Sequence, residues 1–371
     1  MNEQHYLTPL FEPRSVAIIG ASERENSMGS VIVRNMLEAG FKGKLFAVNP
    51  KYDQVLGVPC YKSVEDIPQR LDMAIITTKA DRVPAIVDAC GRAGTKSVVV
   101  LPSGFSDAGP RGRMLEKNTV ENARRHRIRL LGPNCLGILR PELGLNASFA
   151  HGSAATGSIG LISQSGALCS AILDWARPNN VGFSSVVSLG TSVDIDFGEV
   201  LEYMVSDSRT ESIFLYVEGI KDARRFVSAL RAAARVKPVL LIKVGRHPVG
   251  SMAAHLHSGA QVGEDAVFDA ALRRADLAEH LLLLVREVHA GLQRVLVAPG
   301  RELGAQVALG RDRLHVLLLG LEAAGEHGGV AEGVERGGHA ARLQAGAAQA
   351  HGAGALVAGE VALAHRSEEH T

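Results

Sequence analysis

The chain of 371 residues is long enough for two or three domains with cores of their own. A net charge of +1, with 21% charged residues, argues against the strong positive field of proteins that bind nucleic acids or anionic membranes. The four cysteines lack the paired spacing of a metal site, and no apolar run has the length of a signal or membrane span. We therefore expect a reduced, cytoplasmic protein that binds no metal, nucleic acid or membrane.

Strands and helices alternate through the first 140 residues. An amphipathic stretch over 30–39, closed by Gly40, predicts a helix after the first apolar run. Because the carboxyl ends of parallel strands share one edge of a sheet, the polar loops after these strands would line one crevice. The pattern predicts a Rossmann-like domain over 1–140, with strands at 15–19, 45–48, 72–77, 97–101 and 128–131.

The loops of this first domain favour a phosphate-containing ligand. A strand, glycine loop and helix supply backbone amides for an anion, and Gly20 lies in that loop. The dinucleotide fingerprint is absent because Gly20 and Gly29 are too far apart. Pro50 and Lys51 follow the second strand, where nicotinamide-binding folds carry an acidic residue. This favours a phosphoadenosine-type ligand over an ordinary oxidoreductase, with plain turn chemistry as the alternative.

A second cycle of strands and helices follows a small, polar stretch, 152–158, that we interpret as a linker. Ser163, Ser165 and Gly166 stand between a strand and an apolar helix, where a helix N-terminus collects an anion or is simply capped. We expect a flavodoxin-like sheet over 152–275, with strands at 160–163, 184–189, 213–217 and 239–244 and helices from 166 to 175, at 197–205 and at 222–234.

A small, glycine-containing turn at 253–260 presents two histidines, His255 and His257. A neutral imidazole in such a turn can act as a nucleophile near neutral pH. A surface or packed histidine is the alternative, and no third ligand at suitable spacing supports a metal pair.

The composition changes after Ala275. From Asp276 onward there is no Ile, Lys, Asn, Phe, Tyr, Trp, Cys or Met, although unique packing normally needs aromatic and β-branched side chains. The pattern is typical of GC-rich DNA translated in another frame. We expect 276–371 to be a frameshifted or chimeric tail without a domain, disordered or irregularly helical, with a genuine Leu/Ala-rich helix over 277–297 as the alternative.

Five motifs in fixed order carry a family resemblance. They resemble the NDP-forming acyl-CoA synthetases, whose first two domains correspond to the alpha subunit of succinyl-CoA synthetase. Residues 173–176 and 222–230 also resemble the synthetase-like region of bacterial Pat-type protein-lysine acetyltransferases. The motifs are 11–22 (FEPRSVAIIGAS), 131–139 (LGPNCLGIL), 162–168 (ISQSGAL), 216–220 (YVEGI) and 257–263 (HSGAQVG).

The resemblance implies a role for each candidate residue. His257 falls on the phosphorylated histidine, Glu218 on the carboxylate that orients it, and Ser163, Ser165 and Gly166 on the helix end that receives the phosphoryl group. The residues that fall on coenzyme A contacts are Gly20, Ala21, Ser22, Lys51, Thr77, Thr78, Lys79 and Asn134. The implied chemistry joins a small carboxylic acid, through an acyl phosphate, to the thiol of CoA.

The resemblance also implies a part that this sequence does not show, an ATP-grasp domain that would hold ATP and Mg²⁺. We therefore expect the chain to be the CoA-binding and phosphohistidine-relay part of an acid-thiol ligase, completed by an ATP-grasp domain in cis or subunit in trans, as a monomer or a homo-oligomer. The alternative is the acyl-CoA-sensing region of a Pat-type acetyltransferase without synthetase activity.

Overall fold

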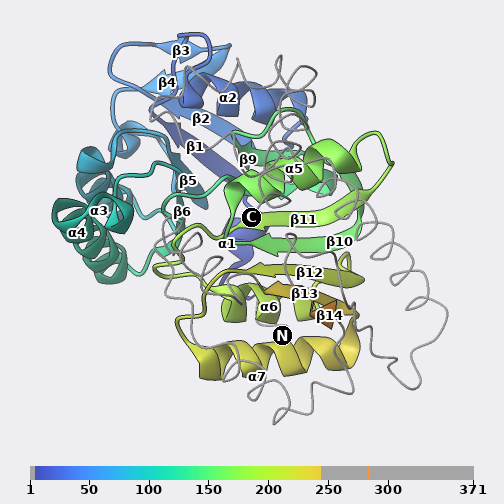
Figure 1. Cartoon of the computed structure of the whole chain (residues 1–371). Coiled ribbons are helices and arrows are strands. Elements are labelled where there is room, and N and C mark those ends of the chain that lie inside the picture. Colours follow the sequence, from blue (N-terminus) through green and yellow to red (C-terminus); the bar gives the residue numbers. More distant parts are fainter. Residues whose placement is uncertain (1–4, 244–282, 285–371) are drawn as a thin grey trace, which may run out of the picture. The chain divides into compact units, whose positions relative to one another are not determined.

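The computed structural model describes residues 5–243 and the two residues 283–284 (Figure 1). They form two sheets flanked by helices, and the described helices are all too short or too polar to cross a membrane. This arrangement is the α/β class that the alternating pattern predicts.

The first sheet has seven strands in the order β3-β4-β2-β1-β5-β6-β7. Its strands are β1 (Ser15–Ile19), β2 (Lys44–Val48), β3 (Gln54–Val55), β4 (Val58–Tyr61), β5 (Met73–Ile76), β6 (Ser97–Val100) and β7 (Arg129–Leu131). All neighbours are parallel except β3 and β4, so the six strands from β4 to β7 follow the Rossmann order. The five predicted strands of this domain are confirmed, with ends that shift by a residue at most.

Helices connect the strands of the first sheet. The connecting α-helices are α2 (Met28–Glu38), α3 (Val83–Arg92) and α4 (Pro110–His126), while α1 (Thr8–Phe11) precedes β1. Short 3-10 turns lie at Val64–Asp66, Ala80–Arg82 and Ser106–Ala108, and a fourth, Pro141–Leu143, belongs to the second sheet. The Ser27 hydroxyl caps α2 by accepting a hydrogen bond from the Ser30 N–H at 3.2 Å. Ile32, Val33 and Met36 on this helix are fully buried, so its apolar stripe faces the core as its sequence predicts.

The second sheet has the order β14-β13-β12-β10-β11-β8-β9. Its strands are β8 (Gly137–Arg140), β9 (Leu145–Ser148), β10 (Ala155–Ser163), β11 (Gly182–Ser188), β12 (Ser212–Val217), β13 (Val239–Lys243) and β14 (Leu283–Leu284). The five parallel strands β10 to β14 follow the flavodoxin order, so the predicted flavodoxin-like sheet is confirmed.

Two features of this sheet differ from the sequence-based expectation. The interpretation of 152–158 as a linker is wrong in its second half, because β10 begins at Ala155 and continues through a bulge. The antiparallel hairpin of β8 and β9 was not predicted. All eight of its residues are buried, so the sequence lacks the alternation that identifies a half-exposed strand.

Three helices connect the parallel strands of the second sheet: α5 (Gly166–Ala176), α6 (Phe197–Ser206) and α7 (Ala223–Val236). Helices α6 and α7 pack against each other (Figure 1). Ser165, Asp196 and Asp222 cap the three helices through their side chains. Asp222, which we expected inside the last helix, is therefore its N-cap.

A fully buried arginine, Arg140, ties β8 to the end of α6. Its Nη1 lies 3.2 Å from the carboxylate of Asp207 and 3.3 Å from the Tyr203 hydroxyl. Its guanidinium also lies over the rings of Phe11 and Tyr203. Because a buried charge is tolerated only when it is paired, the β8–β9 hairpin depends on this contact.

We expect Arg140→Met to lower the free energy of unfolding by about 3–5 kcal/mol, because Asp207 would remain buried without its nearest cation and with only Arg209, at 3.7 Å, to pair with. Urea denaturation of the full chain measures this loss. The double variant Arg140→Met/Asp207→Leu removes both charges and is expected to recover most of it. A double variant as unstable as the single one would show that packing, rather than charge pairing, is what Arg140 contributes.

Candidate functional site

Gly20 marks the crevice of the first sheet, at the point where the strand order reverses beside β1. Its φ of +95° is left-handed, and a Cβ there would lie 2.5 Å from the Thr77 Oγ1. The Gly20 N–H donates to the Val48 carbonyl at 2.9 Å, and the Thr77 hydroxyl donates to the Ile19 carbonyl at 3.0 Å. The ends of β2, β1 and β5 therefore meet at one glycine that no larger residue can replace without strain.

A buried hydroxyl without a hydrogen-bond partner lies in this crevice. The Thr78 Oγ1 has no partner among the described residues. Ala21 is buried, and its carbonyl accepts a hydrogen bond from the Asn49 side chain at 2.7 Å. Because buried polar atoms are normally satisfied, the unpartnered hydroxyl fits a site completed by a polar ligand.

The other predicted contacts of the first domain lie around the same edge, with one exception. Ser22 is half-buried and accepts a hydrogen bond from the Arg24 N–H, whereas Lys51 and Lys79 are exposed at the ends of β2 and β5. Asn134 follows β7, two strands beyond β5 in the sheet, so it does not belong to the same group of strand ends.

The turn that carries Asn134 contacts the loop after β11 instead. Asn134 has a left-handed φ of +55°, and its N–H donates to the Pro102 carbonyl at 3.1 Å. The Pro133 carbonyl accepts from the Thr191 N–H at 2.9 Å. This turn therefore joins the crevice edge of the first sheet to the loop after β11.

The candidate phosphate residues form a closed set of hydrogen bonds where β10 passes into α5. The buried Ser163 hydroxyl donates to the Ser165 carbonyl at 2.9 Å and accepts from the Ser165 N–H at 3.1 Å. The Ser165 hydroxyl caps α5 by accepting from the Leu168 N–H at 3.2 Å. Gly166 begins the helix, and a Cβ there would lie 3.3 Å from the Leu136 nitrogen. The N-terminus of α5 thus presents its amides and the positive end of its dipole at this loop.

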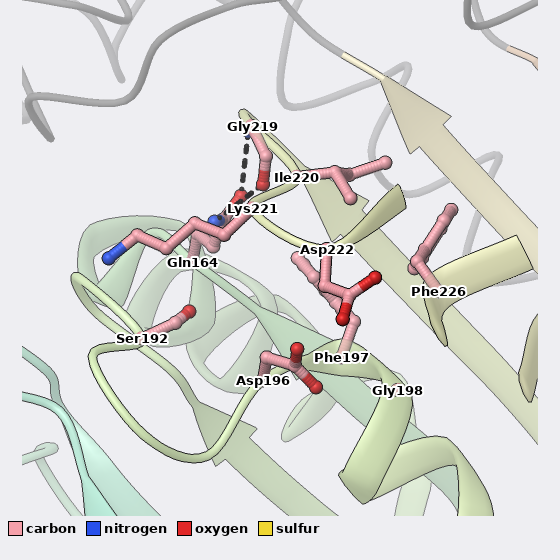
Figure 2. Close-up of a pocket in the computed structure, with 10 residues that line it drawn as sticks. All are labelled: Gln164, Ser192, Asp196, Phe197, Gly198, Gly219, Ile220, Lys221, Asp222 and Phe226. Atoms are coloured by element: carbon pink, nitrogen blue, oxygen red, sulfur yellow. Dashed lines mark hydrogen bonds between the residues drawn. The ribbon is translucent and has the colours of Figure 1, made fainter. Parts of the chain in front are cut away.

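Glu218 lies across from this loop, at the end of the neighbouring strand β12, and only 2% of it is exposed. Its position is fixed by Gln164, which accepts hydrogen bonds at Oε1 from the N–H groups of Glu218 at 2.7 Å and Gly219 at 3.0 Å. The Nε2 of Gln164 donates to the Gly219 carbonyl at 2.8 Å. Figure 2 shows this amide beneath the turn at Gly219, beside a small pocket.

Two lysines near Glu218 were not predicted. Lys243, at the end of β13, is 3% exposed, and its Nζ donates to the Glu218 carbonyl at 3.1 Å. Lys221 borders the pocket in Figure 2 and donates to the Thr191 carbonyl at 2.7 Å. Burial lowers the pKa of Lys221, and the charges of Glu116 and Asp196 oppose that shift. No sequence rule points to these residues or to Gln164, because their roles depend on which strands are neighbours.

The two candidate histidines and two of the four cysteines remain to be described. His255 and His257 lie outside the described residues, as does all of 276–371 apart from Leu283–Leu284. Cys135 and Cys169 are buried, and burial raises the pKa of both thiols to about 12. These two thiols stay protonated at neutral pH and are poor nucleophiles.

The fold and this geometry define a class of protein: a Rossmann-like domain followed by a flavodoxin-like domain, each with candidate residues beside the strand-order reversal. Residues 14–141 match the family described as CoA binding domain, and 156–280 match the succinyl-CoA ligase like flavodoxin domain. The chain therefore carries a CoA binding domain followed by a succinyl-CoA ligase like flavodoxin domain, and it is similar to the alpha region of ADP-forming acyl-CoA ligases.

Named relatives agree with this assignment. The chain is 41% identical over 300 residues to acetate–CoA ligase [ADP-forming] I of Archaeoglobus fulgidus, covering 78% of this chain and 44% of that protein. It is 40% identical to acetate–CoA ligase [ADP-forming] I subunit alpha of Pyrococcus furiosus, covering 72% and 59%. The structure resembles acetyl-coenzyme A synthetase 1 of Candidatus Korarchaeum cryptofilum, solved with phosphate and ADP, with a TM-score of 0.71, 37% identity and coverage of 78% and 61%. The chain therefore spans about half the length of the relatives that it matches.

We expect Ser165→Ala to lower the free energy of unfolding by about 1 kcal/mol, because α5 would lose its cap. Ser27→Ala is the matched control, since Ser27 caps α2 in the same way in the first domain. Thermal or urea unfolding is expected to give similar losses for both. A much smaller loss in Ser165→Ala than in Ser27→Ala would show that the Ser165 hydroxyl contributes little as a helix cap.

Proposed function

We propose that this chain is the CoA-binding and phosphohistidine-relay part of an ADP-forming acyl-CoA ligase. The first crevice would bind CoA through Gly20, Ala21 and Ser22, through Thr77 and Thr78, and through Lys51, Lys79 and Asn134 at its edges. His257 would carry the phosphoryl group in the second crevice. The substrate class is a small carboxylic acid or its acyl phosphate.

The observation that carries this proposal is that two candidate groups, the loop at 163–166 and Glu218, end neighbouring strands where the strand order reverses. The loop at 163–166 ends β10, and Glu218 ends β12, which is the parallel neighbour of β10. A helix N-terminus offsets phosphate charge, and a carboxylate orients an imidazole and stabilises its charged form. Adjacent strands would thus supply the two requirements of a phosphohistidine.

The first crevice fits CoA by its own chemistry. A glycine loop, the start of α2 and the unpartnered Thr78 hydroxyl suit a phosphate-bearing nucleotide. CoA supplies the thiol that accepts the acyl group, while the protein's residues hold its phosphates and adenosine. Lys51 and Lys79 would neutralise phosphate charge at the rim.

ATP and Mg²⁺ would bind to an ATP-grasp domain, in cis or as a separate subunit. One of the relatives named above is an alpha subunit, which supports a partner in trans. We also propose a cytoplasmic location, as a monomer or a homo-oligomer. The named relatives are acyl-CoA ligases, and this favours a ligase over the Pat-type acetyltransferase alternative.

We expect Thr78→Val to raise the Kd for CoA about tenfold without loss of stability, because it removes a buried hydroxyl that has no partner among the described residues. Isothermal titration calorimetry of the full chain with CoA measures the Kd. Thr119→Val is the matched control, because the Thr119 hydroxyl bonds to the Leu115 carbonyl within its own helix. Unchanged CoA affinity in Thr78→Val, or no CoA binding by the wild type, would contradict the assignment of this crevice.

We expect an ATP-grasp subunit and ³²P-labelled ATP to label the wild-type chain on histidine, giving a phosphate that is labile in acid and stable in base. His257→Asn is expected to abolish the label, and Glu218→Gln to slow it about 100-fold by loss of imidazole orientation. Scintillation counting with peptide mass spectrometry locates the phosphate. His255→Asn is the control, and label that survives in His257→Asn would rule out His257 as the carrier.

A further inference from the structure

The residue proposed to orient the histidine, Glu218, lies between two strands that each extend one side chain toward it. It follows β12, whose neighbours are β10 and β13. Gln164 follows β10, and Lys243 ends β13, where it pairs in register with Val217. The backbone of Glu218 is therefore approached from both sides by side chains that sequence analysis did not assign.

Gln164 satisfies both ends of its amide on this one turn. Its Oε1 accepts two N–H groups and its Nε2 donates to a carbonyl, all from Glu218 and Gly219. Only 8% of Gln164 is exposed, so water does not compete effectively for these bonds. A buried amide with three hydrogen bonds has one stable orientation. The turn that it holds is therefore restricted to one conformation.

Lys243 holds the other side of the same peptide. Its ammonium donates to the Glu218 carbonyl, so the N–H and the C=O of Glu218 are both bound by side chains of neighbouring strands. Burying an ammonium costs free energy unless hydrogen bonds and opposite charge offset that cost. The backbone of Glu218 is thus fixed at its N–H and at its C=O. This fixes the direction of the Cα–Cβ bond, and therefore the direction in which the carboxylate points.

We propose that Gln164 and Lys243 are positioning residues, which set the direction of the Glu218 carboxylate relative to the phosphate loop at 163–166. Gln164 belongs to that loop, so one side chain links the two halves of the second crevice. This inference rests on the proposed function, because it assigns Glu218 the role of orienting a phosphorylated histidine.

The first test measures the hold on the turn without any reaction. In Gln164→Met, hydrogen–deuterium exchange resolved to single amides is expected to be at least tenfold faster at Glu218 and Gly219, while 213–217 stay protected. Gln164→Glu keeps an acceptor for both N–H groups and is expected to restore their protection. Asn35→Leu is the matched control, because Asn35 is a buried amide that donates to the carbonyls of Ser148 and Ala150 at 2.8 and 2.9 Å.

The second test measures phosphorylation of the full chain with the ATP-grasp subunit and labelled ATP. Gln164→Met and Lys243→Met are expected to slow labelling by about 100-fold, the usual cost of a misplaced orienting group, with an unchanged Kd for CoA. Gln164→Glu and Lys243→Arg are expected to recover most of the rate. In the double variant Gln164→Met/Glu218→Gln, labelling is expected to be no slower than in Glu218→Gln alone, because Gln164 acts through Glu218.

Each contrary result overturns the inference in a recognisable way. Unchanged exchange at Glu218 and Gly219 in Gln164→Met would show that the turn does not need this amide. Faster exchange with a wild-type labelling rate would show that the hold has no catalytic consequence, and multiplicative slowing in the double variant would show that Gln164 acts independently of Glu218. Failure of the wild type to be labelled would overturn the proposed function and this inference with it. This outcome differs from failure of the inference alone, because the faster exchange in Gln164→Met would persist.

Discussion

The site depends on the reversal of strand order in each parallel sheet. Beside β1 and again beside β10, the connections to the next strands run to opposite sides of the sheet. The loops at the ends of these strands therefore separate, and backbone amides can line the crevice between them. Gly20 and Thr77 occupy this position in the first sheet, and the loop at 163–166 and Glu218 occupy it in the second. Neither group could assemble on an edge strand, because only adjacent parallel strands bring two loop ends together.

Side chains that satisfy buried polar groups give these crevices their fixed shape. Arg140 pairs with Asp207 under the β8–β9 hairpin, and Arg129 joins β7 to Asp194 at 3.0 Å, linking the first sheet to the segment before α6. Gln164 does the same on a smaller scale for the turn at Glu218. In each case a polar side chain meets these partners only in one arrangement of the elements, so it specifies that arrangement as well as stabilising it.

The chemistry of an acyl-CoA ligase needs some groups that this chain would supply and others that an ATP-grasp partner would supply. A glycine loop with an unpartnered hydroxyl suits a nucleotide-bearing thiol, and a capped helix N-terminus opposite a buried carboxylate suits a phosphohistidine. Nucleotide binding would come from an ATP-grasp partner, in keeping with a chain that spans about half the length of its named relatives. In the proposed function, thioester chemistry and phosphate transfer would lie on separate sheets, which the turn at Pro133 connects through Thr191.

The sequence by itself determined the parallel strands, the helices between them and the class of both domains, because apolar runs, glycine loops and N-cap residues are local signals. It also indicated the candidate residues at the strand ends, since such residues follow buried strands directly. It did not reveal the β8–β9 hairpin, whose complete burial removes the alternating pattern. Only the tertiary structure decided that Asn134 lies apart from the other predicted CoA contacts, and that Gln164 and Lys243 hold Glu218. The physical reason is that these contacts join residues 25 to more than 50 positions apart, and strand order, which no local pattern encodes, determines which of them meet.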